Sequence, residues 1–508
     1  MMRLSNRPHV NRLWVGAWVV MLAGCNLAPE YKQPESPVPG QFPEQQLLSY
    51  NAQTGVMTGQ RVLARDVTEQ GGDAADIVWQ DFFQDPPLKT LIGIALRNNR
   101  DLQLAVARMD EAQALWGIQR GEMFPTLGAG ITGARQMGPV PGVSSNVITS
   151  QYAAGIAVTA FELDLFGRLR NLTEVAFQQY LATAEGARAV QITLVADTAV
   201  QYFRWRMASL LLDLTRQTLE SRQRSYRLVN ARFGNGIASE LDVVQAKTLV
   251  DSAAADLARY TRDEQLARNA LAVLLGQPVP LDLPKGLPFE DIELLARIPA
   301  GMPADLIVNR PDIRAAENLL LAANANIGAA RAAFLPNISL TGNLGTASSS
   351  LGGLFKSGRG AWAFTPSITT PIFTGGSLQA GLEQAKASQR AALATYDQRV
   401  QQAFREVADA LAGEASLQAQ FAARRAQLNA AEQFLRLSNA RFFNGVNSFL
   451  DVQIAEIQVF SARQQMVMTA FETVSNRVNL YKAVGGGFDP SALKSDITEP
   501  LTVVDQKS

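Results

Sequence analysis

The sequence predicts a mostly helical chain with a small β part, made of two copies of one structural unit. Three motifs recur in the same order about 210 residues apart. Each half also contains a very long segment rich in Ala, Gln and Arg, and two short segments in which polar and apolar side chains alternate. Period-2 alternation is typical of strands, and long uninterrupted runs of good helix formers are typical of helices.

The repeats establish the duplication. The segment NARFGNGIASELDV begins at Asn230 and recurs 209 residues later as NARFFNGVNSFLDV. Asp101 in NRDLQLAVARMDEA corresponds to Asp312 in NRPDIRAAENLLLAANA, and Gly167 in DLFGRL corresponds to Gly375 in IFTGGSL. Three matches at nearly one offset and in one order are poorly explained by chance.

Composition shifts divide the chain into six expected segments. Residues 26 to about 78 are rich in Pro, Gly and Gln and are expected to be extended chain or loop, and a proline-rich stretch separates the repeats. The expected segments are a signal peptide (1–24), a lipid-anchored extended N-terminal segment (25–78), the first repeat (79–277), a Pro-rich linker (278–303), the second repeat (304–487) and a C-terminal tail (488–508).

The N-terminus has the pattern of a bacterial lipoprotein signal. Arg3, Arg7 and Arg12 precede a short apolar run, and small residues lie before Cys25, the only cysteine. Such a segment is a secretory signal rather than a spanning helix. Leu22 to Cys25 resembles a lipobox, so we expect cleavage before Cys25 and lipid attachment there, which would anchor the chain to a membrane surface. The Asn that follows Cys25 favours the outer membrane.

The composition excludes several kinds of chemistry. The whole chain has 46 basic and 46 acidic residues, and without residues 1–24 the balance is 43 to 46, which gives no reason to expect nucleic acid binding. His9 and Cys25 are the only histidine and cysteine, so a chain processed at Cys25 would lack His/Cys zinc sites, Ser-His triads and Cys-His dyads. We expect neither an enzyme nor a cofactor.

Each repeat is expected to begin with a helix. These helices are predicted at Asp101 to Met123, with Asp101 as a possible cap, and at Asp312 to Phe334, with Pro311 in the opening turn. After two strands comes a long helix, Arg168 to about Phe233 in the first repeat, which would be roughly 100 Å long. Such helices suit packed antiparallel coiled coils, and a coiled-coil spacer without a channel remains an alternative.

Four segments are predicted to be strands. NISLTGNLG and WAFTPSITTPIF alternate clearly, whereas TLGAGITGA and AGIAVTAFEL give a weaker signal. In the clear pair, one face carries Ile338, Leu340, Leu344, Trp362, Phe364, Ile368 and Ile372. Loops rich in Gly, Ser and Pro are expected at Met137 to Gln151 and at Thr346 to Ala361. The pattern suits a membrane barrel with lipid outside, or a half-buried soluble sheet.

Four strands cannot close a barrel by themselves. No apolar run of about 18 residues follows the signal, so a membrane crossing would have to use strands. An open sheet in lipid would leave its edges without hydrogen bonds, so several chains would have to share one barrel with closed symmetry. Two copies would give eight strands and three would give twelve, and composition does not choose between them.

The turns between the long helices have recognisable cap chemistry. In RFGNGIASELDV, Gly236 lies past the end of one helix, where a left-handed cap is expected. Ser239 can cap the next helix, with Asp242 three residues later. The second half repeats this pattern with Gly445, Ser448 and Asp451.

Several long motifs, in order, resemble the TolC-like outer-membrane factors of tripartite efflux systems, in their lipoprotein branch. These motifs are WQDFFQDPPL, ALRNNRDLQLAVAR, FELDLFGRL, MPADLIVNRPDIRAAE, IGAARAAFLPNISLTG, IFTGGSLQA, REVADAL and VNLYKAVGGGF. The resemblance covers almost everything from Trp79 onward. The sequence departs from the family at Phe161, where Trp is usual, and in a longer segment from Gln46 to Asp76.

The resemblance implies an assembly and its partners. It implies a homotrimer with a twelve-stranded β-barrel, four strands per chain, in the outer membrane, continuing into an α-helical coiled-coil barrel in the periplasm. The implied partners are a periplasmic adaptor, an inner-membrane pump and outer-membrane lipid. The implied function is a passive exit duct for small molecules. A lipid-anchored coiled-coil scaffold and a duct for secreted proteins are the alternatives.

The resemblance also implies site residues. Family adaptors meet the helical turns, which correspond here to Gly236, Ser239, Leu241, Asp242, Gly445, Ser448, Leu450 and Asp451. Similar lipoproteins close their periplasmic end with a leucine ring and an acidic ring, and the corresponding positions are Leu428 and Glu432, where Glu replaces the usual Asp. An acidic ring would favour cations.

Overall fold

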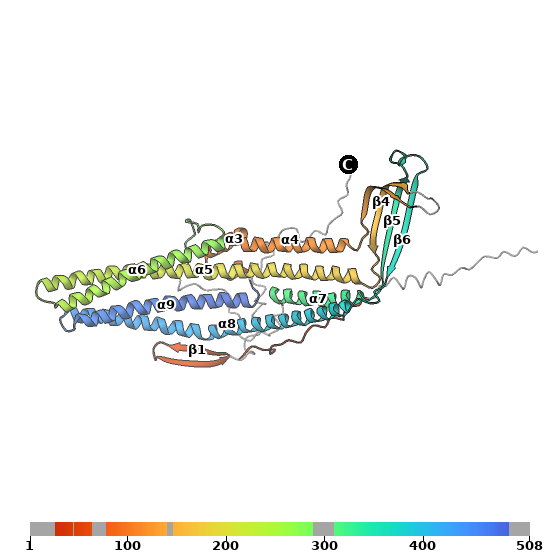
Figure 1. Cartoon of the computed structure of the whole chain (residues 1–508). Coiled ribbons are helices and arrows are strands. Elements are labelled where there is room, and N and C mark those ends of the chain that lie inside the picture. Colours follow the sequence, from red (N-terminus) through yellow and green to blue (C-terminus); the bar gives the residue numbers. More distant parts are fainter. Residues whose placement is uncertain (1–25, 44, 63–77, 140–145, 288–308, 487–508) are drawn as a thin grey trace, which may run out of the picture. The chain divides into compact units, whose positions relative to one another are not determined.

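The computed structural model describes residues 26–43, 45–62, 78–139, 146–287 and 309–486. These residues fold mainly into helices and two small antiparallel sheets (Figure 1). The predicted signal peptide, the predicted lipid site at Cys25 and the predicted C-terminal tail lie outside the described residues. None of the helices in the described part combines the length and the apolar character that crossing a membrane would need.

The chain forms two compact units. The sheet unit contains Arg108–Thr183, Ala315–Tyr396 and the described residues up to Glu35. The helix unit contains Ser36–Ala107 and the described residues of Ala184–Arg314 and Asp397–Ser508. Four helices contribute residues to both units: α4 (Arg100–Gly121), α5 (Arg168–Gly234), α7 (Pro311–Ala332) and α8 (Ser377–Phe443).

The sheet unit contains the four predicted strands. They are β3 (Leu127–Gly138), β4 (Val147–Glu162), β5 (Asn337–Ser348) and β6 (Gly360–Thr369), paired antiparallel in that order. The strands are longer at the predicted loops than expected, so β3 and β4 take over part of the first loop and β5 and β6 part of the second. One face of the sheet leaves apolar side chains exposed, including those of Ile131, Trp362, Phe364 and Ile368.

One residue assigned to the apolar strand face lies outside the strand. Ile372 was predicted to continue the alternation of β6, but β6 ends at Thr369. Pro371 follows, and a proline has no N–H with which to continue a ladder, which explains why the strand stops. Ile372 and the next residue, Phe373, therefore belong to the connection between β6 and α8.

Aromatic side chains pack α4 against α5 within the sheet unit. Trp116 of α4 stacks on Tyr180 of α5 with ring centroids 6.0 Å apart, and Phe177 packs against the same indole at 5.1 Å. The predicted first helix of each repeat is present, and Pro311 opens α7 as expected. The cap of α4 differs from the prediction. Asn99, not Asp101, accepts the bond from the Leu102 N–H at 2.9 Å, because α4 begins one residue earlier than predicted.

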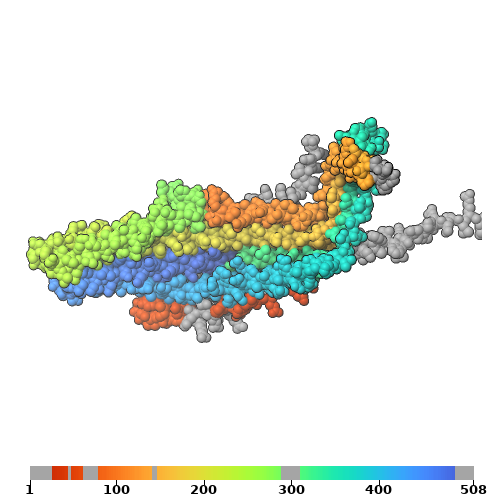
Figure 2. All heavy atoms as spheres, in the orientation of Figure 1, coloured from red at the N-terminus to blue at the C-terminus, as the bar shows by residue number. Residues whose placement is uncertain are grey.

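The N-terminal segment is not wholly extended. Residues 45–62 form a hairpin of β1 (Gln45–Asn51) and β2 (Val56–Val62), which the expectation of extended chain or loop missed. In the space-filling view the hairpin lies on the surface beside the part of α8 that belongs to the helix unit (Figure 2). The turn between the strands is closed by the Asn51 side chain, which accepts bonds from two backbone N–H groups at 2.9 and 3.1 Å.

Two short helices that the sequence analysis did not predict contribute side chains to the core of the helix unit. They are α2 (Trp79–Phe82) and α3 (Pro86–Asn98), which precede α4. Phe82 stacks on Tyr481 at the end of α9 (Phe449–Ala483) with ring centroids 3.9 Å apart. Burying such aromatic pairs removes a large apolar area from water.

A buried carboxylate ties the residues after the first repeat into this core. Asp85 is 1% exposed. It accepts hydrogen bonds from the Tyr202 hydroxyl at 2.6 Å, Arg206 Nη1 at 3.2 Å and the Leu287 N–H at 3.0 Å. Because buried charges are costly unless paired, this arrangement fixes α5 and the start of the predicted Pro-rich linker to the beginning of α3.

In each repeat, the residue just before α4 or α7 donates a side-chain hydrogen bond to a carbonyl near the end of the repeat's last helix. Asn99 donates to the Leu274 carbonyl near the end of α6 (Glu240–Leu275) at 3.0 Å. Arg310 donates to the Ala483 carbonyl at the end of α9 at 2.8 Å. The two side chains and the two carbonyls occupy corresponding positions in the repeats, so the duplication extends to the contacts that close each repeat.

The Arg310 contact predicts a large loss of stability on substitution. Arg310 is 8% exposed and also pairs with Asp312 and Glu406 at 2.8 and 2.9 Å. Arg310→Met would remove both ion pairs, whose carboxylates are about a third exposed, and leave a helix-terminal carbonyl without its side-chain donor, so we expect a loss of about 1–3 kcal/mol. Thermal unfolding of the detergent-extracted protein measures this. The control Arg314→Met, at an exposed arginine, should unfold like the wild type; equal stability of both variants would contradict the role of Arg310.

Candidate functional site

The two interhelical turns lie at the same end of the helix unit. Val229 of α5, Ala246 of α6, Phe442 of α8 and Phe449 of α9 belong to one buried cluster. Each of these residues lies within ten positions of Gly236 or Gly445, so the cluster holds the turn α5–α6 beside the turn α8–α9. The ends of α5 and α8 and the starts of α6 and α9 therefore lie together, and we call this region of the helix unit the tip.

The first turn has the geometry that its sequence predicts. Gly236 has a φ of 73°, and the Ile237 N–H donates to the Arg232 carbonyl at 2.8 Å, which closes α5 with a Schellman-type cap. Ser239 and Asp242 form a reciprocal capping box at the start of α6, with bonds of 3.0 and 3.2 Å.

The second turn repeats the glycine cap but not the capping box. Gly445 has a φ of 74°, and the Val446 N–H donates to the Arg441 carbonyl at 2.9 Å. Ser448 lies at the N-cap of α9, but its side chain makes no cap hydrogen bond, and its hydroxyl is 3.5 Å from the Asp451 carboxylate. The prediction of a full second capping box is therefore wrong.

The tip exposes apolar side chains around both turns, which we call the turn patch. Leu241 and Leu450, two of the predicted docking residues, are 64% and 48% exposed. The sequence analysis missed the other members of the patch, although they alternate with the predicted residues along the same turns. These members are Phe233, Ile237, Val244, Phe443 and Val446. Exposed apolar clusters of this kind are typical of interaction surfaces.

The two predicted gate residues differ in their surroundings within one chain. Leu428 of α8 is buried with Val459, Ala462 and Met466 of α9. Glu432, one turn later, is partly exposed and accepts a hydrogen bond from Arg463 of α9 at 2.6 Å. In a single chain both side chains therefore hold α8 against α9.

The comparisons with known proteins place this geometry in a family. The family model for the outer membrane efflux protein matches residues 91–277 and 302–486. The chain belongs to the outer membrane efflux protein family. The outer-membrane location and the role in efflux that the TolC-like motifs predicted are thereby confirmed.

Close relatives of this efflux protein cover nearly its whole length. It is 44% identical over 475 residues to the solvent efflux pump outer membrane protein SrpC of Pseudomonas putida, covering 93% of this chain and 97% of that protein. It is 39% identical to the outer membrane protein OprJ of Pseudomonas aeruginosa, covering 92% and 94%. Its fold matches the open state of the Neisseria gonorrhoeae MtrE outer membrane channel with a TM-score of 0.80 and 38% identity, covering 92% and 99%.

A buried polar cluster links three helices of the efflux protein above the tip. Arg222 of α5 is 4% exposed and donates to the Leu249 carbonyl of α6 at 3.1 Å. Glu456 of α9 accepts a bond from Ser225 at 3.2 Å, and burial raises the pKa of its carboxyl group. Burial also lowers the pKa of Arg222. The cluster ties α9 to the other helical hairpin.

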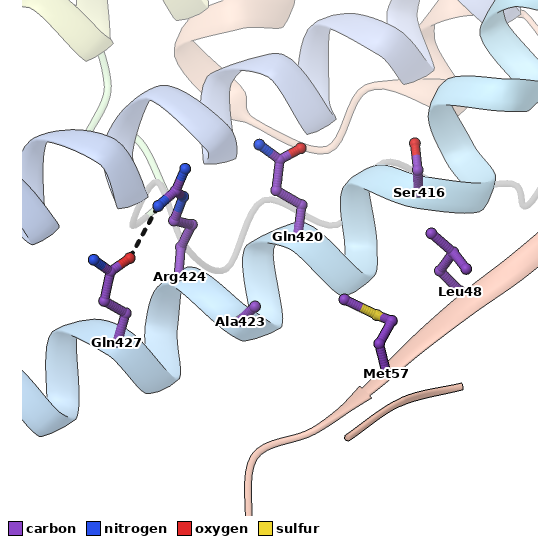
Figure 3. A pocket seen from close by; sticks show the side chains of 7 residues that line it. All are labelled: Leu48, Met57, Ser416, Gln420, Ala423, Arg424 and Gln427. Atoms are coloured by element: carbon purple, nitrogen blue, oxygen red, sulfur yellow. Dashed lines mark hydrogen bonds between the residues drawn. The ribbon is translucent and has the colours of Figure 1, made fainter. Parts of the chain in front are cut away.

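The N-terminal hairpin covers part of α8 in the helix unit. A hollow of ≈ 340 Å³ lies between them, and Figure 3 shows Leu48 and Met57 of the hairpin facing a row of α8 side chains. Its lining residues on α8 are Ser416, Gln420, Ala423, Arg424 and Gln427. Arg424 donates to Gln427 at 2.9 Å and to Gln465 of α9 at 2.7 Å. The first part of the segment from Gln46 to Asp76 therefore lies over α8.

The described residues contain no group of three or more His, Cys, Asp or Glu side chains that could hold a metal ion. Ser239 and Asp242 are engaged in the capping box of α6, and the apolar side chains of the turn patch are exposed. The chemistry of the tip is therefore that of a contact surface.

The glycine caps predict a conformation-specific cost. Gly236→Ala and Gly445→Ala should each destabilise the protein by about 1–2 kcal/mol, since a side chain at positive φ is strained. Gly234→Ala, in the last turn of α5 and with no neighbouring atom near an added methyl group, should be neutral or stabilising. Denaturant unfolding followed by circular dichroism measures the three variants. Equal effects at positions 234 and 236 would contradict the cap assignment.

Proposed function

We propose that this efflux protein is the passive exit duct of a tripartite multidrug efflux system. Three copies share one twelve-stranded barrel in the outer membrane, and their long helices enclose a periplasmic tunnel. An inner-membrane pump supplies the energy, and a periplasmic adaptor joins the pump to the duct. The duct performs no catalytic chemistry. Small molecules are the transported class.

The observation that carries this proposal is the incomplete sheet. Among the described residues, β3 and β6 each have one neighbour, so the sheet has two free edges, and one of its faces exposes large apolar side chains. In lipid, every backbone polar group needs a partner, so such a sheet is suited to a membrane only when further copies close it. The helices that follow β4 and β6 have 67 residues each, which corresponds to roughly 100 Å.

Similar proteins support the partners. The relatives SrpC and OprJ are named as outer membrane proteins, and SrpC as part of a solvent efflux pump. A pump in another membrane must reach this duct through the periplasm, and the turn patch is an exposed apolar surface at the end of the helix unit. We assign adaptor docking to the two turns, centred on Leu241 and Leu450.

The docking assignment predicts a specific loss of efflux. Leu241→Glu combined with Leu450→Glu places two unpaired charges in the contact, so binding to the adaptor should weaken at least about tenfold. A strain that expresses this variant should lose resistance to the exported compounds, while the extracted protein keeps its oligomeric state. Leu281→Glu, at a residue that is 91% exposed outside the turns, is the control. Unchanged resistance with the double variant would contradict docking at the turns.

A periplasmic constriction at Leu428 and Glu432 is part of the proposal. Three-fold symmetry would repeat each residue once per copy. Glu432 keeps part of its carboxylate exposed, so it can face a tunnel while pairing with Arg463. Leu428 supports the position of α8 against α9. Three such carboxylates would favour cations, and the nearby apolar side chains would resist wetting.

The constriction predicts a change in conductance. Leu428→Ala with Glu432→Ala removes the packing and the ion pair that hold α8 to α9, so single-channel conductance in planar bilayers should rise and cells should become permeable to vancomycin. Glu220→Ala, at another exposed ion-paired glutamate, should conduct like the wild type. A double variant that keeps its oligomeric state and conducts like the wild type would place the constriction elsewhere.

Lipid attachment at Cys25 after removal of residues 1–24 completes the proposal. It rests on the lipobox alone, because these residues lie outside the described part of the chain.

A further inference from the structure

The charged residues of the strands and their loops have one sign and lie toward one end of the sheet. Residues 124–161 contain a single charged side chain, that of Arg135, and residues 335–376 contain only Lys356 and Arg359. All three lie toward the end of the sheet at which loops, rather than helices, join the strands. The loop end of the sheet is therefore basic and has no acidic residue to offset its charge.

Arg135 belongs to the apolar face of the sheet. Side chains alternate along a strand, so Arg135 lies on the same face of β3 as Ile131, which is 68% exposed. The neighbouring strand places Tyr152 opposite Gly133 on this face. A Cβ added at Gly133 would lie 3.0 Å from the Tyr152 ring. The ring therefore lies across Gly133, next to Arg135.

The loop between β5 and β6 folds against the same face. Tyr152 is paired with Ser348, the last residue of β5. Ser348 is 6% exposed, and a Cβ added at Gly353 would lie 2.7 Å from its Oγ. Gly353 ends the short 3-10 helix η5 (Leu351–Gly353). The loop therefore bends back over Ser348, on the side of the sheet that carries Tyr152 and Arg135.

This folded loop exposes apolar and basic side chains side by side. Leu354 is 1% exposed and holds the loop down, and the Lys356 N–H donates to the Gly353 carbonyl at 3.2 Å. Leu351 and Phe355 are 63% and 77% exposed, and Lys356 is exposed as well. We call the side chains at this end of the apolar face the rim patch: Arg135, Tyr152, Leu351, Phe355 and Lys356.

The rim patch lies at the boundary of the apolar face that is farther from the helices. Leu127 begins β3 beside α4, and Arg135 follows eight positions later, which corresponds to about 27 Å along a strand. With the tilt of strands in membrane barrels this spans about 20 Å across the bilayer, and the apolar band of such barrels is about 25 Å tall. Aromatic side chains are typical of the band's boundaries, and Tyr152 occupies such a position.

We infer that the rim patch binds the phosphorylated glycolipid that forms the outer leaflet of the outer membrane. Arg135 donates to one phosphate group through its planar guanidinium, and Lys356 pairs with another as a point charge. Tyr152, Leu351 and Phe355 contact the boundary between the sugar and the acyl chains. This inference rests on the proposed placement of the sheet in the outer membrane and adds the class of lipid and the residues that hold it.

The composition of the rim patch favours a lipid over a free anion. A free phosphate would use the two basic side chains but would leave Leu351 and Phe355 in water. A phosphorylated glycolipid has acyl chains directly beside its phosphate groups, which matches large apolar side chains directly beside bases. Near the apolar band, a positive charge also needs an anion more than it does in water, because the local dielectric constant is lower.

A comparison of two lipids tests the charges. The full-length protein, extracted in detergent and freed of co-purified lipid, is titrated with a glycolipid that carries two phosphate groups and with its dephosphorylated form. Native mass spectrometry measures the bound lipid. The wild type should bind the phosphorylated form at least about tenfold more tightly. Arg135→Gln/Lys356→Gln should lose most of this preference.

The control variant removes the same charge elsewhere in the sheet unit. Arg359 immediately precedes Gly360, so the alternation of β6 places it on the face opposite Trp362. Arg390 is exposed on α8. Arg359→Gln/Arg390→Gln should keep the wild-type preference for the phosphorylated glycolipid.

A second variant and a competitor distinguish a lipid from a free anion. Leu351→Ser/Phe355→Ser should weaken binding of both glycolipid forms several-fold by a similar factor, because it removes apolar contact and leaves the bases in place. Inorganic phosphate at the concentration of the glycolipid should not displace it. Displacement by inorganic phosphate would identify a simple anion site and overturn the inference.

The outcomes separate this inference from the proposed function. Loss of the preference only in Arg135→Gln/Lys356→Gln, with the mass of the particle unchanged, supports it. Equal binding of both glycolipid forms by the wild type, or an unchanged preference in that variant, overturns it and leaves the duct standing. Wild-type protein that extracts as folded single chains overturns the proposed function, and the lipid comparison on those chains still decides the inference.

Discussion

Backbone groups at the edges of a sheet need hydrogen-bond partners, and this requirement shapes the rest of the molecule. The strands β3 and β6 end the sheet without a second neighbour among the described residues. Where the exposed apolar face of the sheet meets lipid, water cannot satisfy those edges. A sheet in lipid can then satisfy its edges only when several copies associate. The long helices that follow the strands are thereby arranged around one common axis.

The duplication explains how one chain can supply both sides of each contact. The closing side chains Asn99 and Arg310 act on corresponding carbonyls, and Gly236 and Gly445 close corresponding helices. The repeats also differ in two places. The second repeat lacks the capping box of the first, and its connection after β6 is exposed where the first is covered. The two turns at the tip are thus similar in backbone and different in side chains.

Local signals carried most of the fold that the sequence could predict. The long helix predicted from Arg168 begins there because its sequence is a continuous run of good helix formers. Gly236 adopts a positive φ at little steric cost because glycine has no Cβ. Alternation located all four strands of the sheet unit. Alternation also misplaced Ile372, because the pattern of side chains continues past the Pro371 that ends the ladder.

Contacts between distant segments could not be read from the sequence. The hairpin of β1 and β2 depends on α8 for cover, and its Gln-rich composition resembles a loop. Ser448 has the right residue type for a cap, but its hydroxyl does not reach the backbone. Leu428 was expected from resemblance alone, and only packing shows that it meets α9. The turn patch could be found only from the exposed fractions of its side chains, because single exposed apolar residues carry no signal in a sequence.

The mass of the detergent-extracted, full-length protein tests the central claim most directly, since a closed barrel requires copies that complete one another's sheet. The account predicts a particle of three chains that persists on dilution in detergent. A stably folded single chain, with its sheet edges free and its fold intact, would contradict it.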